Sequence, residues 1–130
     1  MTLDDLEAAL PNGLHDAEIH SIAIDYVART ARFILDAWVG TMDMPAGPER
    51  ERYRRASLEL TGLQYLAIQP PDFRPQYHFA DTAPVKTGGL SPVDVPSPLP
   101  EDAFEAELFI ADWNSFIQVA ATDARLTWLD

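Results

Sequence analysis

The chain has 130 residues, 47% of them hydrophobic, which is enough for a single domain with a substantial core over residues 1–130. It has no cysteine, so disulfide frameworks, thiolate metal sites and thiol nucleophiles are excluded. With 21 acidic residues against 9 basic ones, its formal net charge of −12 disfavours nucleic acid and anionic membranes as partners. Solubility alone, or a basic protein or cationic ligand as partner, agrees with that charge.

The N-terminal residues predict a short helix. Residues 3–10 place Leu3, Leu6 and Leu10 on one face, Thr2 suits the N-cap, and a Pro-Asn-Gly sequence ends the helix. A secretory signal would begin with basic residues, whereas this segment has two aspartates and none. Because no stretch reaches the roughly 20 apolar residues of a membrane span, we expect a cytoplasmic protein without membrane partners.

Residues 19–40 predict a β-hairpin. Residues 19–27 are rich in β-branched and aromatic types, the turn falls at 28–30, and the return strand alternates apolar with polar residues. Ile34 and Trp38 lie on the polar side of that second strand. We therefore expect something to cover part of this face, and a second copy of the chain is one alternative.

The middle of the chain predicts one strand or a bent pair, followed by a long loop. In residues 56–68 the alternation reverses at Gly62, which is typical of a β-bulge. The arginine-rich run at 49–55 offers either an anion site or a surface neutralised by its own glutamates. Residues 70–102 hold eight of the eleven prolines, so we expect no regular strand or helix there.

Residues 104–128 predict a β-meander of three strands. We expect its core side to bury five residues: Leu108, Ile110, Ile117, Val119 and Leu126. Short links between the elements favour antiparallel pairing. The predicted class is α+β, mostly antiparallel β-sheet of about six strands, with a short N-terminal helix and a long proline-rich loop.

The segment HDAEIH at 15–20 is the one cluster with chemical potential. In a strand, alternate residues share a face about 7 Å apart, so Asp16, Glu18 and His20 present metal or proton-transfer groups on one side. That face would continue into Ile22, and no further ligand from another strand is evident. We therefore interpret Asp16 as a turn residue and both histidines as partly buried rings, and we expect no metal or cofactor. A small-ligand binder or metal-dependent enzyme remains the alternative.

The end of the chain offers a candidate protein-binding site. Trp113 follows Asp112 in a predicted hairpin turn, where a large apolar side chain is hard to bury, and tryptophan is favoured in binding hot spots. Glu105 and Glu107 share the solvent face of the strand that leads into this turn. No nucleotide-binding, nucleophile or zinc-protease motif is present, so we do not expect an enzyme.

Three segments resemble a known group of proteins: LHDAEI at 14–19, LELTGLQYL at 58–66 and FEAELFIADWNSFIQVAATDARLTWL at 104–129. The chain resembles small bacterial immunity proteins of polymorphic toxin systems and related uncharacterised families. This resemblance implies a non-enzymatic domain that binds and neutralises a toxin, and nuclease toxins are basic. Our leading hypothesis is therefore a protein-binding domain, with a structural or accessory homodimer as an alternative.

Overall fold

The computed structural model of the protein describes residues 1–70, 85–91, 98–110 and 115–130. Of residues 85–91 it describes the backbone alone. These residues form one helix and eight strands, and all paired strands are antiparallel. The predicted α+β class with mostly antiparallel sheet is therefore confirmed. The elements are α1 (Leu3–Ala9), β1 (Glu18–Asp25), β2 (Thr30–Trp38), β3 (Tyr53–Thr61), β4 (Tyr65–Ile68), β5 (Val85–Ser91), β6 (Phe104–Ile110), β7 (Ser115–Ala121) and β8 (Asp123–Trp128).

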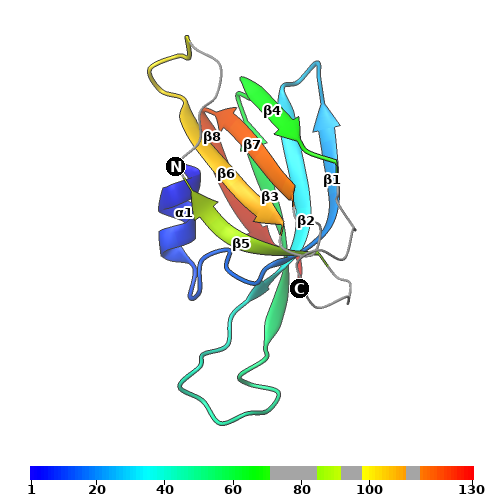
Figure 1. The fold of residues 1–130 in the computed structure, drawn as a ribbon, viewed down its shortest axis with the longest axis vertical. Helices are drawn as coiled ribbons and strands as arrows, with labels where there is room; N and C mark the ends of the chain where they lie inside the picture. Colours follow the sequence, from blue (N-terminus) through cyan, green and yellow to red (C-terminus); the bar gives the residue numbers. More distant parts are fainter. Residues whose placement is uncertain (71–84, 92–97, 111–114) are drawn as a thin grey trace.

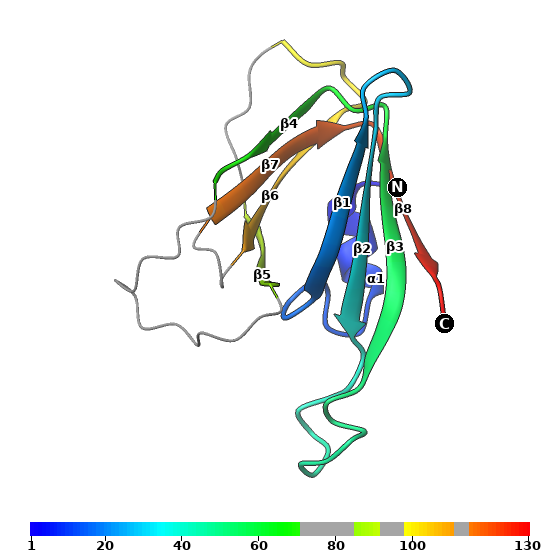
Figure 2. The same ribbon diagram turned by 90° about the vertical axis from the view of Figure 1, so that its right-hand side faces the viewer.

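The strands follow one another in the order β4-β7-β6-β5-β1-β2-β3-β8, and this sheet folds over into two layers. One layer holds β1, β2, β3 and β8, and the other holds β4, β7, β6 and β5 (Figure 1). Seen from the side, the two layers meet near one end and diverge toward the other (Figure 2). Only two residue pairs, Glu18 with Lys86 and Ile19 with Val85, join β1 to β5. Among the described residues, no helix is long and apolar enough to cross a membrane.

Helix α1 begins after Thr2, the predicted N-cap, which forms a capping box with Asp5. The Thr2 hydroxyl accepts from the Asp5 amide at 3.0 Å, and the Asp5 carboxylate accepts from the Thr2 amide at 3.1 Å. The helix lies against β8 and β6 and buries Leu3 and Leu6 (Figure 1). It therefore adds apolar surface to the core that the two layers enclose.

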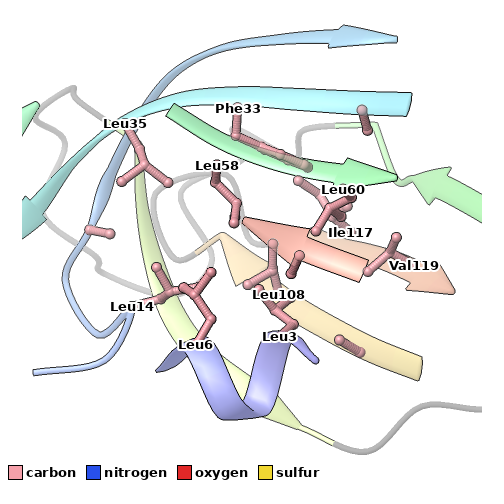
Figure 3. Packing of buried hydrophobic residues seen from close by; sticks show 14 of the residues in the cluster. Leu3, Leu6, Leu14, Phe33, Leu35, Leu58, Leu60, Leu108, Ile117 and Val119 are labelled. Carbon is pink, nitrogen blue, oxygen red and sulfur yellow. The ribbon is translucent and has the colours of Figure 1, made fainter. Parts of the chain in front are cut away.

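The core lies between the two layers and is built by alternation within the strands. Leucine, isoleucine, valine and phenylalanine side chains from both layers and from α1 meet there (Figure 3). Leu108, Ile110, Ile117 and Val119 are buried, and Leu126 is half-buried against the same cluster. The predicted core side of the meander is therefore confirmed, with Leu126 at its margin.

The hairpin of β1 and β2 is shorter than expected. Its turn begins at Tyr26, which is 85% exposed, and includes Val27, which is 97% exposed. The Asp25 carboxylate accepts from the amides of Val27 and Ala28 and so fixes the turn two residues earlier than β propensity indicates. The expectation that Tyr26 and Val27 belong to the strand is wrong, because this side-chain–backbone turn replaces the ladder there.

A bulge at His20 changes the phase of β1. Ile19 pairs with Leu35 and Ser21 with Ile34, so His20 is an extra residue without a partner position in β2. Ile19 therefore faces the core before the bulge and Ile22 faces it afterwards, while His20 lies outside. The expectation that the face of His20 continues into Ile22 is wrong for this reason.

Gly62 marks a passage between the layers rather than a bulge within one strand. Its φ of +61° suits glycine, and an added Cβ would collide with the side chain of Thr122. At this crossing the Thr122 amide donates to the Thr61 carbonyl at 3.1 Å. The segment 56–68 thus divides into β3 and β4, which lie in different layers.

The proline-rich segment contains a strand, which is contrary to expectation. β5 runs from Val85 to Ser91 between Pro84 and Pro92, so no proline falls inside it. Its register with β6 shifts between Thr87 and Leu90, where two glycines stand. The prolines flank the strand and do not interrupt it. The described residues therefore form eight strands, where six were expected.

The polar side of β2 is covered in part by the chain itself. Trp38 is buried, and its indole Nε1–H donates to the Arg50 carbonyl at 2.7 Å. Asn12 donates to the carbonyls of Trp38 and Gly40 and ties the N-terminal segment to the same place. The expected cover over Trp38 is therefore the loop of residues 39–52, while Ile34 stays half-buried.

Candidate functional site

Four polar side chains meet on the outer face of β1, β2 and β3, and we call Glu18, His20, Asp36 and Arg55 the His20 cluster. His20 Nε2 lies 2.8 Å from Asp36 Oδ2. Arg55 donates through Nε to Asp36 Oδ1 and through Nη2 to Asp36 Oδ2 at 3.2 Å. One ligand atom each from Glu18, His20 and Asp36 lies within 4.8 Å of the others. The register explains this, because Glu18 and Arg55 are the two partners of Asp36.

Charge around the His20 cluster is partly balanced. The hydrogen bond from Arg55 lowers the pKa of Asp36, and His20 lowers it further, against the opposing effect of burial. Asp36 in turn raises the pKa of Arg55. Burial raises the pKa of the neighbouring Tyr53 phenol, and Glu18 adds to this shift through its negative charge. Asp36 is therefore ionised at neutral pH, and the carboxylate of Glu18 lies beside it.

The structure brings together only part of the predicted set. Glu18 and His20 lie in the His20 cluster, whereas Asp16 belongs to the turn before β1, where its φ is +60°. His15 lies 3.4 Å from Asp16, and its side chain is 63% exposed. His20 is hydrogen-bonded to Asp36, but both histidines are exposed, so the interpretation of the two as partly buried rings is wrong. Asp36 was missed because only the register of β1 with β2 reveals it.

A second candidate lies on the outer face of β4, β7 and β6, which we call the acidic face. Glu105 pairs with Ala120, and Glu107 pairs with Gln118, whose amide donates to Glu107 at 3.3 Å. The next pair on this face is Phe109 with Phe116, with ring centroids 5.0 Å apart and both rings half-buried. Glu105 is exposed. The predicted solvent face of β6 is therefore present and has an aromatic pair beside it.

Charge is divided unevenly along the chain. Residues 87–124 contain no lysine or arginine and seven acidic residues: Asp94, Glu101, Asp102, Glu105, Glu107, Asp112 and Asp123. Every described arginine belongs to β2, β3, β8 or the loops at either end of β2. The predicted contact residues Asp112 and Trp113 lie outside the described residues. In the sequence, Asp112 and Trp113 follow β6, the strand that carries Glu105 and Glu107.

Two arginines of the arginine-rich run are paired with carboxylates that lie far away in the sequence. Arg54 makes a two-oxygen contact with Asp130 and places its guanidinium 4.1 Å from the centroid of Trp128. Arg55 is held by Asp36. These two arginines are therefore already paired with carboxylates, which disfavours the reading of this run as an open anion site.

A hollow of about 230 Å³ lies at the far end of β1 from His20. It is lined by the end of the first hairpin and the start of β4: Ile24, Asp25, Tyr26, Arg29, Leu63, Gln64, Tyr65 and Leu66. No residue of the His20 cluster lines it. The cluster is instead on the open surface of the sheet, with His20 36% exposed.

Comparisons of the chain with models of protein families, with curated proteins and with solved structures found no match. No relative therefore assigns a role to either the His20 cluster or the acidic face.

Proposed function

We propose that the protein is a non-enzymatic domain that binds a basic protein partner through the acidic face and through Asp112 and Trp113, which follow β6 in the sequence. The observation that carries this proposal is the charge division: residues 87–124 have seven acids and no base. Two of the arginines elsewhere, Arg54 and Arg55, are already paired with Asp130 and Asp36.

Such a face has the two properties that protein recognition needs. A surface rich in carboxylates attracts a basic surface over about 8 Å at physiological salt and speeds the encounter. The paired rings of Phe109 and Phe116 lie one residue pair beyond Glu107 and supply apolar contact once the partner is seated. Cationic side chains of the partner can lie over these rings as well as beside the carboxylates.

The particular partner that the resemblance implies is a basic toxin enzyme in the bacterial cytoplasm. Neutralisation would then require only that the domain cover the toxin's substrate-binding surface. The domain needs no catalytic group of its own for this role.

Capture from the native host with three baits tests this proposal. The wild type should retain a basic protein, and a Glu105→Gln/Glu107→Gln variant should retain much less of it. The matched control is Glu49→Gln/Glu51→Gln, which removes the same charge from the exposed loop before β3. Retention of the same partner by all three baits would show that binding does not use the acidic face.

A further inference from the structure

We propose that Glu18, His20 and Asp36 bind one divalent transition-metal ion, with Zn²⁺ as the best match to the donor set. This inference is independent of the proposed protein binding, because the site lies on the layer of β1 and β2 and not on the acidic face.

The three ligands come from two strands, β1 and β2. The sequence had disfavoured a metal because no ligand from a second strand was evident, and Asp36 is that ligand. The bulge keeps His20 on the outer face beside Glu18, and the register sets Asp36 directly opposite Glu18. Zinc binds nitrogen and oxygen at about 2.0–2.2 Å, so two ligands of one tetrahedral ion lie roughly 3.3 Å apart. The ligand atoms are now up to 4.8 Å apart. Small rotations of these surface side chains would shorten the separations to the value that zinc requires.

The donor types select the ion. One imidazole and two carboxylates suit zinc or manganese, whereas magnesium and calcium prefer oxygen alone. Two carboxylates also balance the charge of a divalent ion. Three protein ligands leave the remaining position to solvent, since the cluster is on the open face of the sheet.

Arg55 is compatible with a bound ion. Its Nε holds Asp36 Oδ1, and its Nη2 donates at 3.2 Å to Oδ2, the oxygen nearest His20, so Oδ2 becomes the metal-facing atom only when Nη2 moves away. Hydrogen bonds of this kind fix ligating carboxylates in many metal sites. Its Nη2, however, lies 3.4 Å from His20 Nε2 and must withdraw when an ion enters. Arg55 thus orients Asp36 while its charge weakens the affinity.

Calorimetric titration of the metal-free protein with zinc chloride tests the site, with thermal melts to confirm that each variant folds. We expect one zinc per chain in the wild type, and at least a tenfold loss of affinity in His20→Gln and Glu18→Gln. The matched control is His15→Gln, another exposed histidine beside an aspartate, which should bind zinc like the wild type. Magnesium at the same concentration should not compete.

A fourth variant separates the site from non-specific binding to an acidic surface. Removing the charge in Arg55→Gln should tighten zinc binding, on the order of tenfold, because a cation next to the ion is lost. Equal zinc binding in the wild type and His20→Gln, or weaker binding in Arg55→Gln, would overturn the proposal.

Discussion

Leu108 is the residue whose truncation best tests the two-layer core. It is 1% exposed, pairs with Ile117 across β6 and β7, and lies near Leu3 of α1 in Figure 3. Replacing leucine with alanine removes three carbon groups, which costs about 2.4 kcal/mol at roughly 0.8 kcal/mol each. The ladders on both sides of the core hold the backbone in place, so a cavity remains and adds roughly 1–2 kcal/mol. The free energy of unfolding should therefore fall by about 3–4 kcal/mol.

Urea denaturation followed by tryptophan fluorescence measures this loss. The control is Leu129→Ala, which truncates a leucine that is 47% exposed and should change the free energy of unfolding by less than about 0.5 kcal/mol. A loss below about 1 kcal/mol in Leu108→Ala would show that this side of β6 faces water, and the register of the meander would then be incorrect.

Two further predictions concern the crossing and the His20 cluster. Gly62→Ala forces a side chain into a φ of +61° and against Thr122, so the free energy of unfolding should fall by at least about 2 kcal/mol, and Thr122→Ala should restore part of it. No loss in thermal or urea unfolding would contradict the passage of the chain at this point. Asp36 has a lowered pKa because of Arg55, so its stabilisation is present above the unfolded pKa of about 3.9 and is lost as pH falls through the lower folded value. The wild type should therefore exceed Asp36→Asn in stability at neutral pH and lose that advantage by about pH 2, and a pH-independent difference would contradict the ion pair.

The local elements of the fold were predictable from the sequence. The leucine spacing and Thr2 predict α1, and the alternation of apolar and polar residues predicts β6, because both patterns report burial on one face. β5 was not predictable, since its glycines and flanking prolines resemble a loop and one of its two partners, β1, is distant in sequence. The turn at Asp25 overrode the β propensity of Tyr26, which shows how one carboxylate can end a strand.

Predicting the candidate sites required the register between strands, whereas predicting most helices and strands did not. Glu18 and His20 were recognisable as a pair, but Asp36 joins them only because β2 returns opposite β1 with a bulge at His20. Sequence periodicity reports which residues share a face within one strand, and it carries no information on the offset between strands. The acidic side of β6 required no register, so Glu105 and Glu107 were predicted directly.

The dependence of association rate on salt tests the central claim, that the acidic face recruits a basic partner. Stopped-flow kinetics with the captured partner should show the association rate falling steeply as salt rises for the wild type, and less steeply for Glu105→Gln/Glu107→Gln. Trp113→Ala should mainly speed dissociation, since an apolar contact is not screened by salt. An association rate that is the same at low and high salt would contradict the account.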